Sequence, residues 1–85
     1  MSIRILYFAR LREDMGIATE MFQLPAEVSD VNSLRAELVA RGGASAAALG
    51  QGKAVRVSVN QDLARGDTPV KPGDEVAFFP PVTGG

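Results

Sequence analysis

The chain has 85 residues, and its nine Lys or Arg and ten Asp or Glu leave a formal net charge of −1. One small domain is expected at this length, and the near-neutral balance gives no basic face of the kind that binds nucleic acid. The sequence contains neither Cys nor His. This excludes disulfides, a thiol nucleophile, a Cys/His zinc site and a His-based catalytic triad.

No segment predicts a membrane span or a metal site. The longest stretch without a charge, residues 42–52, has 11 residues, whereas a spanning helix needs about 20. The apolar run at the N-terminus contains Arg4 and lacks a small-residue cleavage site, so it does not resemble a signal peptide. The acidic residues are scattered along the chain. We expect a cytoplasmic protein that binds no metal.

The first predicted element is a strand over residues 2–9 (SIRILYFA), which are rich in Ile, Tyr and Phe. Side chains alternate between the two faces of a strand. One face therefore carries Ile3, Ile5 and Tyr7, and the other carries Arg4, Leu6 and Phe8. Because the second face is apolar beyond Arg4, we expect this strand to be partly covered on both sides.

A loop and a second strand are predicted next. Residues 10–16 (RLREDMG) are charged and end on Gly, which we interpret as a loop. Residues 19–24 (TEMFQL) have the composition of a strand. Pro25 ends it, since proline cannot donate to a strand ladder.

Residues 31–41 are predicted to form an amphipathic helix. Asp30 is a suitable N-cap, and Val31, Leu34 and Leu38 follow at helical spacing. Glycines directly after the segment end the helix. The apolar stripe is narrow and one-sided, so the helix should lie on a sheet.

The remaining elements are shorter. Residues 44–49 (ASAAAL) are interpreted as a small-residue connector in preference to a helical turn. Residues 54–60 (AVRVSVN) alternate Val with polar side chains and predict a strand, followed by a turn at residues 60–62 and a short irregular piece from Leu63. Residues 75–79 (EVAFF) form the last predicted strand.

This order of elements predicts an α+β fold of the β-grasp or ubiquitin-like kind, a mixed sheet with one main helix packed on it. The first and last strands should be parallel and central, which explains why both are apolar. We expect the β-grasp domain to cover residues 1–79 and an extended tail to cover residues 80–85.

Two side-chain features leave alternatives open. Arg10 and Arg12 flank a strand end, where they either bind an anionic partner or are ordinary surface charges. Phe78 and Phe79 point to opposite faces of the last strand. One of them can enter the core, and the other needs cover either from this chain or from a partner protein.

The C-terminus carries the most specific signal. Two terminal glycines occur by chance in about one chain in 200, and here they follow the last strand without a linker. Pro80 and Pro81 stiffen the base of the tail. Gly84 and Gly85 have no Cβ, so they can enter a channel too narrow for side chains.

The terminal carboxylate is ionised at neutral pH and is a poor electrophile. It needs activation, and the sequence offers neither a phosphate-binding loop nor a metal site for that purpose. A second protein would have to supply both. The alternative is that the two glycines are simply a frayed chain end.

The sequence also resembles a known family. Residues 74–85 (DEVAFFPPVTGG), residues 3–13 (IRILYFARLRE) and residues 58–63 (SVNQDL) are similar to the corresponding segments of the small subunit of molybdopterin synthase. The resemblance runs from Ile3 to Gly85 and is weakest over residues 42–53. It implies the β-grasp fold and a sulfur carrier that is not an enzyme by itself.

In that family, an activating enzyme resembling the ubiquitin-activating type uses ATP to adenylate the terminal carboxylate. Sulfur then displaces AMP to give a thiocarboxylate, here on Gly85 beside Gly84. The loaded tail enters the large synthase subunit and donates sulfur to cyclic pyranopterin monophosphate, which builds the dithiolene of molybdopterin. The resemblance implies a heterotetramer of two small and two large subunits, and no cofactor bound by this chain.

The resemblance also assigns partner contacts. Phe8, Arg12, Leu63 and Phe79 fall at positions that contact the large subunit or the activating enzyme in the family. The tail residues that would enter the partner are Pro80, Pro81, Val82 and Thr83, followed by the two glycines. Three other functions compete with this one: the sulfur carrier of thiamine synthesis, a ubiquitin-like modifier joined to lysine through Gly85, and an interaction module with an inert tail.

Overall fold

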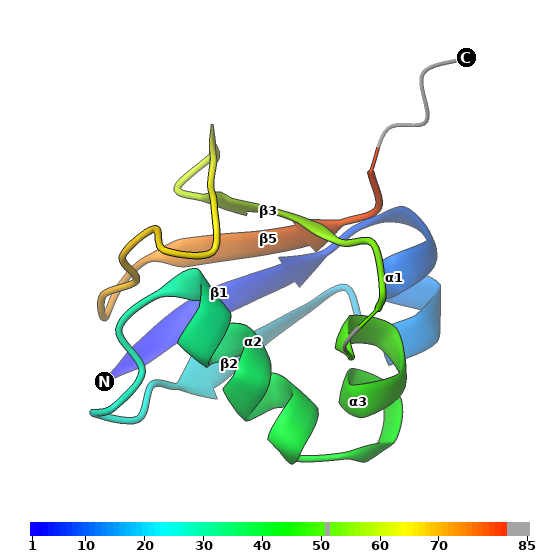
Figure 1. Cartoon of the computed structure of the whole chain (residues 1–85), viewed down its shortest axis with the longest axis horizontal. Helices are drawn as coiled ribbons and strands as arrows, with labels where there is room; N and C mark the ends of the chain where they lie inside the picture. The colour runs from blue at the N-terminus through cyan, green and yellow to red at the C-terminus, as the bar shows by residue number, and fades with distance from the viewer. Residues whose placement is uncertain (51, 82–85) are drawn as a thin grey trace.

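Five strands form one mixed sheet, and three helices lie against it (Figure 1). The structure, a computed structural model, describes residues 1–50 and 52–81. The strands are β1 (Ser2–Tyr7), β2 (Thr19–Gln23), β3 (Arg56–Val59), β4 (Asp62–Leu63) and β5 (Glu75–Phe79). The helices are α1 (Ala9–Met15), α2 (Val31–Ala40) and α3 (Gly43–Leu49).

The strand order β2-β1-β5-β3-β4 places the first and last strands side by side in the middle of the sheet. They run parallel, with Ile5 opposite Val76 and Tyr7 opposite Phe78, and all other pairs are antiparallel. This confirms the predicted central pair. The most apolar strands occupy the positions where neighbours on both sides satisfy the backbone.

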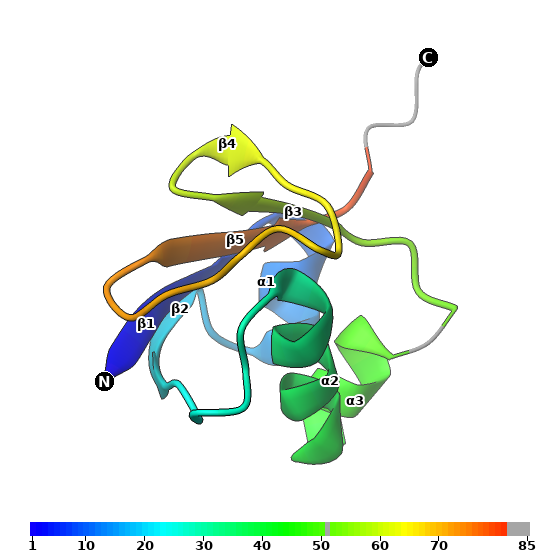
Figure 2. The same cartoon turned by 60° about the vertical axis from the view of Figure 1, so that its left-hand side comes forward.

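The helices lie on one side of the sheet (Figure 2), and the residues of the hydrophobic core lie between the two layers. Ile3, Ile5 and Tyr7 of β1 are almost fully buried in it. Leu34 and Leu38 of α2 belong to the same cluster, and neither is exposed to solvent. The predicted helix stripe therefore packs on the predicted inner face of the first strand.

The start of α2 is set by a capping box at Asp30. The Ser33 N–H donates to Asp30 Oδ1 at 2.8 Å, and the Asp30 N–H donates to Ser33 Oγ at 3.1 Å. These reciprocal bonds satisfy two amide groups that a helix start leaves unpaired. Hydrogen bonds from the Ser33 side chain and backbone lower the pKa of Asp30. The predicted N-cap is confirmed.

The prediction of a loop over residues 10–16 is wrong, because helix α1 occupies most of it. Leu11 is buried and Met15, four residues later, packs against the same core. Two apolar side chains four apart share one helix face, which is enough to hold a two-turn helix against the protein. Gly16 ends α1 in the left-handed conformation, with φ of 77°.

The interpretation of residues 44–49 as a connector is also wrong, because they belong to helix α3. Alanine has the highest helix propensity, and the buried residues Ala48 and Leu49 give the helix an inner side. Isolated helices of this length are marginal in water, so packing decides the outcome.

The turn predicted at residues 60–62 is confirmed. Asn60 and Gln61 have φ of 51° and 72° and reverse the chain between β3 and β4. Asn60 Nδ2 donates to Asp74 Oδ1 at 3.0 Å, and the Glu75 N–H donates to Asn60 Oδ1 at 3.0 Å. The turn is thereby tied to the start of β5.

Within the described residues, no helix is both long and apolar enough to cross a membrane.

Candidate docking face and tail root

The sheet has an open face opposite the helices, and its side chains form rows across the strands. The longest row carries Thr19, Leu6, Ala77, Ser58 and Leu63, from β2 to β4, as the strand registers place them. Since paired residues point to the same side of a sheet, all of these side chains share the open face. We call this surface the docking face.

A second row lies next to the C-terminal end of β5. The Phe8 N–H donates to the Phe78 carbonyl at 3.1 Å, which extends the β1–β5 ladder by one residue and places Phe8 beside Phe79. Arg56 of β3 is opposite Phe79 on the other side. Two aromatic residues therefore occupy neighbouring register positions where the sheet ends.

The structure brings three of the four predicted contact residues to the docking face. Phe8 is 49% exposed, Leu63 is 64% exposed and Phe79 is half-buried. They come from three different elements, and only the sheet places them on one surface. Exposed large apolar side chains that gather in this way are typical of protein–protein contacts.

Phe78 and Phe79 point to opposite faces of β5, as the alternation along a strand predicts. Phe78 is 1% exposed and stacks on Tyr7, with the ring centroids 6.1 Å apart. Phe79 lies half-buried on the docking face. Part of the Phe79 side chain therefore remains exposed to solvent on this face.

Arg12 is separate from the sheet residues. It lies on α1, is exposed, and forms no hydrogen bond or ion pair through its side chain with residues 1–50 or 52–81. The sequence did not single out Met21, which is 67% exposed and opposite Arg4 on the same face of the sheet. The alternation within β2 was the signal available for it.

The tail leaves the body from the end of the central strand β5. Pro80 and Pro81 are half-buried beside a hollow of about 270 Å³ whose other lining residues are Ala9, Arg10 and Ala54. Because β5 is paired on both sides, the base of the tail has a fixed position on the body. The predicted tail residues Val82 and Thr83 and the predicted reactive end, Gly84 and Gly85, lie outside the described residues.

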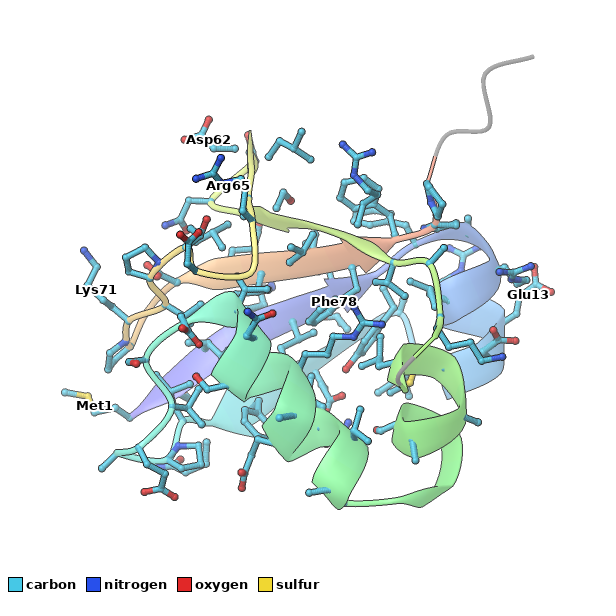
Figure 3. All side chains as sticks on the ribbon, in the orientation of Figure 1. Met1, Glu13, Asp62, Arg65, Lys71 and Phe78 are labelled. Carbon is cyan, nitrogen blue, oxygen red and sulfur yellow. The ribbon has the colours of Figure 1, made fainter. Side chains whose placement is uncertain are left out.

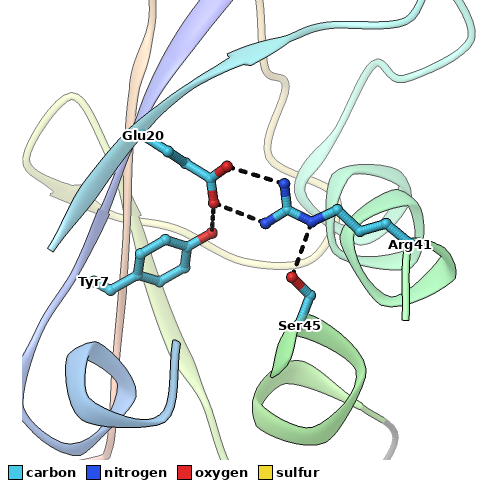
Figure 4. Close-up of polar contacts among 4 residues, drawn as sticks. All are labelled: Tyr7, Glu20, Arg41 and Ser45. Carbon is cyan, nitrogen blue, oxygen red and sulfur yellow. Dashed lines mark hydrogen bonds and ion pairs between the residues drawn. The ribbon is translucent and has the colours of Figure 1, made fainter. Parts of the chain in front are cut away.

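Behind the sheet, a polar network joins four elements (Figure 4). The Tyr7 hydroxyl donates to Glu20 Oε2 at 2.7 Å, and the Arg41 guanidinium donates to both Glu20 oxygens at 2.9 and 2.7 Å. Arg41 Nε also donates to Ser45 Oγ at 2.9 Å. The Arg41 guanidinium lies over the ring of Phe22, 5.8 Å from its centroid.

The contacts within the network shift the pKa values of Glu20 and Tyr7 in opposite directions. Hydrogen bonds from Arg41 lower the pKa of Glu20 despite its partial burial. Burial, followed by the Glu20 carboxylate, raises the pKa of the Tyr7 hydroxyl. At neutral pH, Glu20 is therefore charged and Tyr7 neutral, which suits an anchor between strands and helices more than an acid–base site.

Across residues 1–50 and 52–81, no three acidic, Cys or His side chains are grouped so as to hold a metal ion.

A mixed sheet in the order β2-β1-β5-β3-β4 with helices packed on one side is the β-grasp arrangement of the ubiquitin-like proteins. Within that class, the model of the ThiS family matches residues 5–85, and the chain belongs to this family. It is 45% identical to the molybdopterin synthase sulfur carrier subunit of Escherichia coli K12 over 83 residues, which cover 98% of this chain and 99% of that protein.

Two solved structures place the fold in the same group. SAMP1 from Haloferax volcanii superposes with a TM-score of 0.77 at 28% identity, and all of both chains is covered. A chain from the complex of subunits 1 and 2 of the molybdopterin-converting factor of Helicobacter pylori 26695 gives a TM-score of 0.66 at 26% identity, again with full coverage. These comparisons confirm the β-grasp fold and the resemblance seen in the sequence.

Proposed function

We propose that this chain is the sulfur carrier subunit of molybdopterin synthase, acting in molybdenum cofactor biosynthesis in the cytoplasm. The observation that carries the proposal is the 45% identity to the Escherichia coli carrier subunit over nearly the full length of both chains. The chain is a carrier and does not catalyse the reaction on its own. Its reactive group is the carboxylate of Gly85.

The carboxylate must first become an electrophile. One of its oxygens attacks the α-phosphate of ATP in an activating enzyme, and pyrophosphate leaves with the electron pair of the broken P–O bond. Sulfur from a donor then attacks the acyl carbon and displaces AMP, which leaves a thiocarboxylate on Gly85. ATP belongs to the activating enzyme in this scheme, and the carrier binds no cofactor itself.

The loaded tail then acts in the large synthase subunit. Its charge resides largely on a polarizable sulfur, so the thiocarboxylate attacks cyclic pyranopterin monophosphate as a nucleophile without any Cys in this chain. The sulfur takes the place of an oxygen substituent of the pterin side chain, which gives a thioester to Gly85. Water then hydrolyses the acyl–sulfur bond, so that the sulfur stays on the pterin and the Gly85 carboxylate is regenerated. Two such transfers give the dithiolene. We propose that two small and two large subunits form a heterotetramer. The similarity that supports this proposal is to a chain from the complex of subunits 1 and 2 of the Helicobacter pylori molybdopterin-converting factor.

The described residues support delivery of a tail by a docked body. Phe8, Leu63 and Phe79 share one face of the sheet, and Phe79 immediately precedes Pro80. A body that docks through this face raises the effective concentration of the tail in the partner's active site. Ordering the tail costs about 1–2 kcal/mol per residue, and Pro80 and Pro81 reduce that cost by restricting the free chain.

A ubiquitin-like modifier is the second candidate function, and one observation favours it. The small archaeal modifier protein 1 of Haloferax volcanii has the same fold, with a TM-score of 0.75 at 26% identity. In that case Gly85 would end in an amide bond to a lysine side chain. The thiamine-pathway carrier would instead share the thiocarboxylate and differ in the acceptor.

Intact mass spectrometry tests the proposal. The chain is incubated with the activating enzyme, ATP and a sulfur source, and we expect one oxygen to be replaced by sulfur at Gly85. Deletion of Gly85 is the matched variant, and it should fold normally yet acquire no sulfur. An unchanged mass of the native chain with an enzyme that loads a known carrier would refute the carrier function, whereas transfer of the chain to other proteins would favour the modifier.

A second experiment tests which molecule accepts the sulfur. Loaded carrier is mixed with the large synthase subunit and cyclic pyranopterin monophosphate, and molybdopterin formation is followed. We expect product from the native chain and none from the Gly85 deletion. Product formation by the deletion variant would contradict the proposed role of the C-terminus.

A further inference from the structure

Strand β2 is an open edge of the sheet. It pairs with β1 on one side, and among residues 1–50 and 52–81 no strand pairs with its other side. The edge strand at the opposite margin, β4, has only two residues, whereas β2 has five. Figure 3 shows Asp62 of β4 at that opposite margin. We call the outer side of residues 19–23 the open edge.

The ladder with β1 determines which backbone groups point outward at the open edge. The Tyr7 N–H donates to the Ala18 carbonyl at 2.8 Å, and the Leu24 N–H donates to the Met1 carbonyl at 2.8 Å. In an antiparallel ladder, residues bonded to the neighbouring strand alternate with residues that are not. The even-numbered residues of β2 therefore face β1, and the N–H and C=O groups of residues 19, 21 and 23 point away from the sheet.

The open edge lacks the features that usually prevent strand pairing. Edge strands are commonly protected by Pro, by Lys, by a bulge or by being very short. Residues 19–23 (TEMFQ) contain no Pro and no Lys, and their register with β1 has no bulge. Glu20, the one charged residue, is paired with Arg41, and Met21 at the centre is 67% exposed. A second strand can therefore approach without burying an unpaired charge.

We propose that two copies of this chain pair through their open edges, as antiparallel strands related by a twofold axis at Met21. In this register the two Met21 residues are opposite each other, and Thr19 of each copy is opposite Gln23 of the other. Each of these pairs exchanges two backbone hydrogen bonds. The two sheets become one continuous sheet.

The side-chain pattern of β2 favours a second copy as the occupant. Across the twofold axis, Glu20 is opposite Phe22 of the second copy, so no like charges face each other. Arg41, the cation beside these residues, is already paired with Glu20 and lies over Phe22 of its own copy. On the docking face, the two apolar Met21 side chains meet at the axis. Such a contact is self-complementary, as the twofold interface of a homodimer must be.

This pairing leaves the docking face and the tail root free. The twofold axis is perpendicular to the sheet, so both docking faces point to the same side. Met1, directly before β1, lies at the opposite end of the sheet from the C-terminal end of β5 (Figure 3). Because the axis reverses the strand direction in the second copy, the two tail roots leave the pair at opposite ends. The inference is therefore independent of the proposed function.

Disulfide trapping tests the pair, because the chain has no Cys of its own. Two residues opposite each other in a hydrogen-bonded pair have Cα atoms about 5.5 Å apart, within the range of a disulfide. Met21→Cys is compared with Leu63→Cys, since Leu63 is 64% exposed on the other edge strand. Under the same mild oxidant, we expect Met21→Cys to form a covalent dimer about 10-fold faster, because pairing raises the local thiol concentration.

Sedimentation equilibrium of the native chain, at concentrations up to about 1 mM, measures the reversible pair. A stable interface buries about 1,600 Å², and one edge strand shares much less, so we expect weak association. Met21→Lys should abolish it, because two ammonium groups would face each other across the axis. Leu63→Lys, which has the same net charge, should leave it unchanged. Melting temperatures establish that both variants fold.

Equal trapping rates for the two cysteine variants, or a native chain that stays monomeric at about 1 mM, would overturn the proposal. Loss of association in Leu63→Lys would also overturn it, because the copies would then meet through the docking face. Amide shifts of residues 19, 21 and 23 that appear only when the large synthase subunit is added would assign the open edge to that subunit instead. None of these outcomes affects the loading of Gly85, which the mass measurement tests.

Discussion

Replacing Arg41 with Met tests how the helices are held to the sheet. Met keeps an unbranched apolar stem but removes both hydrogen bonds to Glu20, at 2.9 and 2.7 Å, and the one to Ser45 at 2.9 Å. Hydrogen bonds to charged groups contribute about 1.5–3 kcal/mol each when buried. Arg41 is 37% exposed and Glu20 is 18% exposed, so solvent screens part of this energy.

We therefore expect a loss of about 2 kcal/mol in the free energy of unfolding, well below the sum of the individual bonds. Urea denaturation followed by circular dichroism at pH 7 measures it. With a slope of about 1 kcal/mol per molar urea for a small protein, the midpoint should fall by about 2 M. Arg65→Met is the matched control, because its ion pair with Asp67 is 3.8 Å long and both partners are largely exposed; it should show no measurable loss.

The same variant has a predicted pH dependence. The folded protein lowers the pKa of Glu20, chiefly through the hydrogen bonds from Arg41. A lowered pKa stabilises the fold above the unfolded value, about 4.3 for Glu, and this stabilisation is lost as pH falls through the folded value. The difference between the native chain and Arg41→Met should therefore be full at pH 7 and smaller near pH 3. An equal difference at the two pH values, or a double-mutant cycle with Glu20→Gln that shows no coupling, would refute this account.

Two further predictions concern the docking face and the core. Phe79→Ala should weaken binding to the large subunit more than 10-fold in isothermal titration, as expected for an aromatic side chain buried in an interface. The melting temperature should stay near the native value, because the ring lies outside the core. Native-like binding would show that Phe79 is not part of the interface. Leu34→Ala should cost about 2–5 kcal/mol of unfolding free energy, measured in urea, because Leu34 is fully buried against the sheet. A loss below 1 kcal/mol would contradict that packing.

The sequence alone determined the main elements and the fold class. Alternation in residues 2–9 identified the inner side of β1 correctly, and the spacing of Val31, Leu34 and Leu38 identified α2. These signals are local, because strand and helix periods repeat within a few residues. The order of the elements, together with two apolar strands suited to the centre, then led to the β-grasp arrangement that the structure confirms.

The sequence predicted that β1 is partly covered on both sides, and on the docking face the structure shows this for one residue and not for the next. Leu6 is half-buried on the docking face between neighbouring strands, whereas Phe8 is 49% exposed. No helix was needed for this cover. Adjacent side chains in a row shield one another, and that depends on strand register, which one strand's sequence does not specify.

Tertiary packing determines whether α1 and α3 form, because each has only seven residues and is too short to be stable alone. The network of Tyr7, Glu20, Arg41 and Ser45 spans elements far apart in the chain, and no local pattern reports such a contact. The docking face likewise depends on the sheet, which brings Phe8 and Leu63 to one surface. The Gly-Gly pair at residues 84–85 was visible in the sequence itself, because two adjacent residue types can be recognised without any tertiary structure.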